Sequence, residues 1–196
     1  MTCIVGLVEK GEVYLGGDSA GSTPDTDLVV RKDPKVFKKD HFVFGFTTSF
    51  RMGQLIQFKF NPPPQPPNVD LFQYMVTDFI DELRKTLNDG GFGHKENNRE
   101  RGGTFLVGVL GRLFRIESDY QVGEALDGYD AVGCGSEIAK GSLFATPYHA
   151  PQHRLQTALE AAERWNAGVR APFNYVDTKT AVDRSWILAN KSDIPF

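Results

Sequence analysis

The chain has 196 residues, of which 40% are hydrophobic and 24% are charged, as in a folded globular protein with a substantial core. A formal net charge of −3 provides no basic face for nucleic acid or for an anionic membrane. No apolar run approaches the ~20 residues that cross a bilayer, and two cysteines make no disulfide framework. Because the start of the chain has neither a signal-peptide nor a transit-peptide pattern, we expect a cytoplasmic protein that binds neither nucleic acid nor membrane.

The first part of the chain is rich in predicted strands. Residues 3–9 and 12–17 predict a hairpin that turns at Lys10 and Gly11. A polar loop at 21–27, short strands at 28–31 and 35–38 and a firmer strand at 41–47 follow. A helix is predicted over 48–60, and the proline-rich residues 62–67 form a stiff connector after it. Apolar residues at helical spacing predict the clearest amphipathic helix over 70–87.

The second part repeats the change from strands to helices. The glycine-rich and charged residues 89–103 predict an exposed loop, and 104–110 with 113–117 predict a hairpin around Gly111 and Arg112. A strand over 129–133, helices over 136–146 and 152–165, and a strand over 173–177 follow, while residues 179–196 are ambiguous. This order argues against alternating βαβ units. It favours an α+β fold of two packed sheets with helices outside, in a single domain over 1–196.

The most informative chemistry lies at the start of the chain, where Thr2 follows Met1 directly. Removal of Met1 would give Thr2 a nucleophile, its Oγ, and a base, its own α-amino group, on one Cα. A threonine hydroxyl needs a nearby base to take its proton. A free α-amine has a pKa of about 7.7–8.0 in model peptides, which suits that role at neutral pH. The apolar strand that follows ties this terminus into a sheet.

Other local signals are weaker. The glycines around Cys134 lack the full pattern of a dinucleotide-binding turn, and there is no phosphate-binding lysine motif. His149 and His153 have Pro151 between them and no third ligand, which favours a solvated pair over a zinc site. We therefore expect no cofactor and no metal. The proline-rich residues 62–67 could make a peptide-binding module, but a rigid linker is the better interpretation.

Five short motifs, in this order and spacing, resemble the proteasome β subunits and most closely the HslV-type bacterial peptidases: 1–2, 16–18, 33–36, 42–46 and 129–136. The resemblance covers nearly the whole chain, except for the proline-rich connector, the 89–103 loop and the C-terminal tail. It implies the four-layer αββα sandwich of the N-terminal-nucleophile hydrolases. It also implies a homo-oligomeric ring that encloses a proteolytic chamber, peptide or unfolded-protein substrates, and an ATP-driven unfoldase as partner.

Carried over to this chain, the resemblance makes Thr2 the nucleophile, released when Met1 is removed. It makes Asp18 the acid at the end of the first hairpin and Lys35 the basic residue beside the nucleophile. Gly45 matches the glycine whose backbone N–H helps to form the oxyanion hole. A buried Lys35 would favour alkoxide character on the Thr2 Oγ and oppose protonation of the amine, and Asp18 would keep that lysine charged.

The supporting positions depart from the family pattern. Cys134 stands where many members have serine, Asn166 lies near the position of an aspartate, and Val169 lies near that of a further serine. These departures keep an alternative open, in which the chain is a catalytically inactive, proteasome-like structural or assembly subunit of a ring. Cys3 is a second alternative nucleophile, although it would need loss of both Met1 and Thr2 or a separate activating histidine. The sequence favours a threonine-type endopeptidase.

Overall fold

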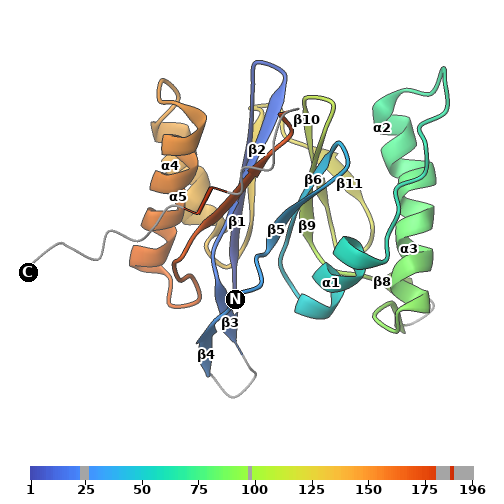
Figure 1. The fold of residues 1–196 in the computed structure, drawn as a ribbon, viewed down its shortest axis with the longest axis horizontal. Coiled ribbons are helices and arrows are strands. Elements are labelled where there is room, and N and C mark those ends of the chain that lie inside the picture. Colours follow the sequence, from blue (N-terminus) through green and yellow to red (C-terminus); the bar gives the residue numbers. More distant parts are fainter. Residues whose placement is uncertain (23–26, 97–98, 180–185, 188–196) are drawn as a thin grey trace, which may run out of the picture.

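Two antiparallel five-stranded sheets lie face to face in the computed structural model, which describes residues 1–22, 27–96, 99–179 and 186–187 (Figure 1). The first sheet has the strand order β12-β1-β2-β13-β14, and helices α4 and α5 cover its outer face. The second has the order β11-β10-β9-β6-β5, and α1, α2 and α3 cover its outer face. The predicted four-layer αββα sandwich is confirmed.

The elements of the first sheet and its helices are β1 Cys3–Glu9, β2 Glu12–Gly17, β12 Tyr129–Gly133, β13 Asn174–Asp177, β14 Trp186–Ile187, α4 Ser136–Ala145 and α5 Pro151–Trp165. Those of the second are β5 Val36–Lys39, β6 Phe42–Phe46, β9 Phe105–Val109, β10 Arg112–Ile116, β11 Val122–Glu124, α1 Phe50–Phe58, α2 Leu71–Tyr74, the π-helical segment η1 Met75–Phe79 and α3 Ile80–Asp89. Two short hairpins pair β3 Ala20–Ser22 with β4 Leu28–Val30 and β7 His94–Glu96 with β8 Arg99–Arg101.

Strand β1 is buried on both faces because it lies in the middle of the sandwich. Cys3, Val5 and Leu7 pack against α4 and α5, whereas Ile4 belongs to the apolar layer between the sheets. This alternation follows from the two-residue period of a strand. Covering both faces explains why the strand is a continuous apolar run and why the chain start is held firmly.

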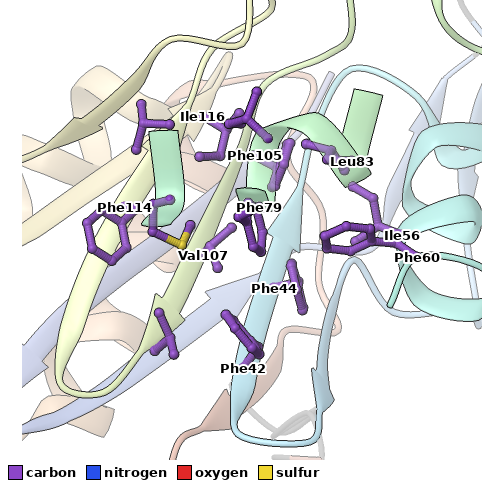
Figure 2. Packing of buried hydrophobic residues seen from close by; sticks show 14 of the residues in the cluster. Phe42, Phe44, Ile56, Phe60, Phe79, Leu83, Phe105, Val107, Phe114 and Ile116 are labelled. Carbon is purple, nitrogen blue, oxygen red and sulfur yellow. The ribbon is translucent and has the colours of Figure 1, made fainter. Parts of the chain in front are cut away.

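An aromatic cluster fills the space between the second sheet and its helices (Figure 2). The ring of Phe79 stacks on Phe44 at 6.5 Å between centroids and meets Phe60 edge-on at 5.1 Å. Phe79 lies in η1, so the helix predicted over 70–87 changes to π geometry in its middle. Asp70 caps its start by accepting a hydrogen bond of 2.7 Å from the Phe72 N–H.

The first hairpin turns at Lys10 and Gly11, as predicted, with φ of 52° and 77°. Left-handed values at both central residues match the right-handed twist of the strands, and glycine adopts them without strain. The second long hairpin turns one residue earlier than predicted, at Leu110 and Gly111. The tips of the two hairpins touch, because a Cβ at Gly111 would lie 2.8 Å from the Gly11 carbonyl oxygen.

Several expectations about short elements were wrong. The stretch 89–103 is no simple loop, since it contains the β7–β8 hairpin; β11 was missed, and β3 occupies the start of the predicted polar loop at 21–27. These strands have three residues each, too few to show a hydrophobic period against glycine and charged neighbours. Residues 23–26 and nearly all of the ambiguous tail 179–196 lie outside the described residues.

Candidate active site

Thr2 lies directly before β1, at the edge of the space between the two sheets, and only 5% of its surface is exposed. Its backbone is held on both sides. The Thr2 N–H donates to Cys134 Sγ at 3.2 Å, and its carbonyl accepts from the Gly135 N–H at 3.3 Å. A chain start is usually frayed, but this one is tied to the turn after β12.

Lys35 and Asp18 form a buried ion pair beside the Thr2 hydroxyl. Lys35 Nζ donates to Thr2 Oγ1 at 3.1 Å and to Asp18 Oδ1 at 2.7 Å. The exposed fractions of the two charged side chains are 1% and 0%. Asp18 follows β2 of the first sheet and Lys35 precedes β5 of the second, so the opposing sheets bring the three residues together.

Three backbone donors and Lys35 surround the Asp18 carboxylate. Oδ1 also accepts from the Cys3 N–H at 3.0 Å, while Oδ2 accepts from the N–H groups of Ala20 at 2.9 Å and Arg170 at 3.2 Å. Hydrogen bonds to a charged carboxylate favour that form and compensate for its burial. The arrangement therefore holds a fixed negative charge next to Lys35.

The charge of Lys35 depends on a balance between burial and its partner. Burial lowers the pKa of Lys35 below that of an ordinary lysine, and the Asp18 carboxylate opposes this fall. An isolated buried ammonium would tend to lose its proton, so Asp18 is the group that keeps it charged. The pair thus provides a cation in direct contact with the Thr2 oxygen.

Cys134 and Asn166 make a second set of contacts on the nitrogen side of Thr2. The Asn166 side chain is oriented by two backbone groups, because its Nδ2 donates to the Cys134 carbonyl at 2.8 Å and its Oδ1 accepts from the Gly168 N–H at 2.9 Å. The Cys134 thiol can donate to Asn166 Oδ1 at 3.2 Å, which leaves Sγ free to accept from the Thr2 nitrogen. Uncharged groups therefore line this side of Thr2.

Met1 covers the nucleophile. The Thr2 hydroxyl donates to the Met1 carbonyl, and the Met1 side chain packs directly on Gly168, where a Cβ would collide with it. Removal of Met1 would expose both the hydroxyl and the nitrogen of Thr2 while leaving the contacts of the other site residues in place.

Gly45 is placed differently from the other predicted residues. It pairs with Val36 in β5 and with Leu106 in β9, inside the second sheet. A Cβ at this position would lie 2.5 Å from Ile4 Cγ2, so the close packing of the two sheets requires glycine here. No polar contact in the described part of the chain joins Gly45 to Thr2, and its part in an oxyanion hole stays a prediction.

Two residues at the site were missed from the sequence. Arg170 contributes only a backbone N–H, and Ser19 is a buried hydroxyl that donates to the Pro172 carbonyl at 2.6 Å and holds the same segment. No sequence pattern marks either of them.

One alternative nucleophile loses support. Cys3 is fully buried, and burial raises the pKa of its thiol, so a nucleophilic thiolate is disfavoured there. The side chain of Val169 is also fully buried, in the apolar layer under α5, and has no polar role.

The ring centres of His149 and His153 lie 4.8 Å apart, but no group of three or more metal-ligating side chains occurs among the described residues. Within the same ranges, no helix has the length and apolar character to span a membrane.

Comparison with known proteins gives matches at the level of structure. No protein-family model and no curated protein matches the chain. Thiobacillus denitrificans BPH is 17% identical with a TM-score of 0.69, covering 93% of this chain and 100% of that one. HslV from Trypanosoma brucei is 17% identical with a TM-score of 0.63, covering 90% and 98% of the two chains. An Anbu variant from Hyphomicrobium is 16% identical with a TM-score of 0.68, covering 97% and 88%. The chain therefore has the fold of the proteasome-like N-terminal-nucleophile hydrolases.

Proposed function

We propose that this chain is a threonine-type peptidase in which Thr2 becomes the N-terminal residue after Met1 is removed. One observation carries the proposal: Lys35 Nζ lies 3.1 Å from Thr2 Oγ1 while it is paired with Asp18 at 2.7 Å. A buried ammonium at that distance favours negative charge on the oxygen and opposes protonation of the freed amine.

In the proposed reaction, Thr2 Oγ1 attacks the carbonyl carbon of a peptide bond while the Thr2 α-amine takes its proton. The tetrahedral intermediate then collapses, and the amine gives the proton to the leaving nitrogen. The acyl part of the substrate remains as an ester on Oγ1. Water, activated by the same amine, hydrolyses this ester and restores Thr2. One donor to the oxyanion contributes roughly 100- to 1000-fold in rate; the resemblance assigns this role to Gly45, whose own N–H lies within the ladder of β5, β6 and β9.

The proposed substrates are peptides and unfolded proteins, and the proposed assembly is a homo-oligomeric ring in the cytoplasm with an ATP-driven unfoldase as partner. The proteasome-like fold supports this proposal. So does a second structure of Thiobacillus denitrificans BPH, with a TM-score of 0.70 to this chain, which is in complex with epoxomicin. The alternative is an inactive ring subunit, and the first experiment separates the two.

The test is intact-protein mass spectrometry before and after incubation with a peptide α′,β′-epoxyketone, a reagent whose stable adduct needs a hydroxyl and a free amine on one residue. We expect loss of Met1 and a single adduct that maps to Thr2. Thr2→Ser should still react and Thr2→Ala should not, while Cys134→Ser, which removes the nearest thiol, should keep the adduct. Retained Met1 with no adduct would support the inactive subunit.

A further inference from the structure

A chain of side-chain contacts leads from the nucleophile toward solvent. Lys35 Nζ contacts Thr2 Oγ1 at 3.1 Å and lies 5.8 Å from the centre of the Phe50 ring. The guanidinium carbon of Arg31 lies 3.9 Å from the same centre, which is a close cation–π contact. Lys35 is buried, Phe50 is half-buried, and the Arg31 side chain is 36% exposed. Phe50 and Arg31 therefore continue this side of Thr2 from the buried lysine to the partly exposed surface.

Arg31 is held in place before any substrate arrives. Its aliphatic part lies across Gly21, where a Cβ would come within 2.7 Å of Arg31 Cδ, and its backbone N–H donates to the Ser19 carbonyl at 2.8 Å. Asp33 accepts from Arg31 Nε at 2.9 Å and from Nη2 at 2.7 Å. Stacking and a bidentate pair together fix the plane of the guanidinium.

This arrangement leaves unused hydrogen-bond donors close to the site. A guanidinium has five N–H groups, and only the contacts to Asp33 engage the Arg31 head group within the described residues. Lys35 has its own buried carboxylate, so it does not compete for an acceptor from a substrate. The unused N–H groups of Arg31 on this side of Thr2 can therefore bind a hydrogen-bond acceptor of a substrate.

We propose that Arg31 selects substrates with an acidic side chain at the residue whose carbonyl carbon Thr2 attacks. A Glu or Asp side chain would accept from the free N–H groups of Arg31 while its methylene carbons lie against the Phe50 ring. Asp33 limits this preference because its negative charge repels the incoming carboxylate. The proposal rests on the peptidase function proposed above, and it makes Arg31 a specificity-determining residue.

The test uses three fluorogenic peptides that differ only at the attacked residue, which is Glu, Gln or Leu. The wild type should cleave them with kcat/KM in the order Glu, Gln, Leu. Arg31→Met keeps the stem on Gly21 and should lower the Glu-to-Leu ratio about tenfold, as expected for loss of a hydrogen bond to a charged group. Asp33→Asn removes the repelling charge and should raise that ratio. A ratio that is unchanged in both variants, or a wild type that prefers Leu, overturns the proposal.

A binding measurement separates this proposal from the reaction itself. In Thr2→Ala, calorimetric titration should show tighter binding of the Glu peptide than of the Leu peptide, and adding Arg31→Met should remove the difference. If the wild type forms no adduct at Thr2 and cleaves no peptide, the peptidase function fails. If it cleaves all three peptides but Thr2→Ala binds them equally, only the specificity proposal fails.

Discussion

Thr2 lies between a charged side and an uncharged side. Lys35 and Asp18 face its hydroxyl, whereas Cys134 and Asn166 face its nitrogen. This division suits a residue that must deprotonate its oxygen and keep its amine neutral. A carboxylate near the nitrogen would favour the ammonium form, so the asparagine that departs from the family pattern is compatible with catalysis.

Asn166→Asp tests the uncharged side. The new carboxylate would raise the pKa of the Thr2 α-amine and move the acidic limb of the pH–activity profile about one unit upward. Activity should fall at pH 7 and recover at higher pH, because the neutral amine is the working form. The measurement is kcat/KM against pH, with thermal unfolding as the control for structure. An acidic limb that does not move contradicts this role.

The charged side sets the basic limb of the same profile. Burial lowers the pKa of Lys35 below that of an ordinary lysine, so the lysine loses its proton, and the site its cation, at a lower pH than an exposed lysine would. Activity should therefore decline on the alkaline side at a lower pH than an ordinary lysine would give, and the decline should move to higher pH in any Lys35→Arg variant that retains turnover. A wild-type profile that stays flat until the protein unfolds would exclude Lys35 from the rate.

Much of the site could be predicted because it lies close to the start of the chain and depends on side chains. Thr2, Asp18 and Lys35 are recognisable by residue type and by position relative to predicted strands. Arg170 is not, since it supplies a backbone N–H from a segment 152 residues away and its side chain takes no part. Backbone donors have no residue-type signature, so only the folded chain shows them.

At the scale of elements, the sheets were predictable, as was the short strand β4, but several other three-residue strands were not. β1, β2 and β6 are apolar on both faces and stand out in the sequence, whereas β7, β8 and β11 have three residues each. The change to π geometry at η1 also has no sequence signal, because the apolar spacing continues through it. Close packing between β1 and β6, in contrast, requires glycine at one position.

Gly45→Ala tests that close packing. The added Cβ would meet Ile4 Cγ2 at 2.5 Å and push the two sheets apart, with a loss of about 2 kcal/mol in the free energy of unfolding. The matched control is Gly123→Ala in β11, where nothing lies within 4 Å of the new atom and the change should stay within about 0.5 kcal/mol. Urea titrations of both variants make the comparison. Equal effects would remove the packing argument.

At the scale of the whole molecule, the helical layer over the first sheet has exposed aromatic side chains. Phe144, Tyr148 and Trp165 are 75%, 99% and 76% exposed. Large exposed aromatic groups favour association with a partner surface. Together with the proteasome-like fold, they support the ring that the proposed function requires.

Native mass spectrometry tests the ring. We expect a homo-oligomer of six or more chains for the wild type and for Thr2→Ala, since Thr2 is buried and is not part of this exposed surface. Phe144→Glu should shift the population toward smaller species while the monomer remains folded by circular dichroism. A wild type that stays monomeric at every concentration would contradict a closed chamber.

The four donors around Asp18 also bear on the order of events during synthesis. Three of them come from residues 3, 20 and 35, but the fourth, the N–H of Arg170, is made long after the others during translation. A nascent chain on the ribosome, or a fragment from a prematurely ended message, has the nucleophile and the lysine but an incompletely held carboxylate. The carboxylate that holds Lys35 in the proposed reaction is therefore fully bound only after residue 170 has been synthesised.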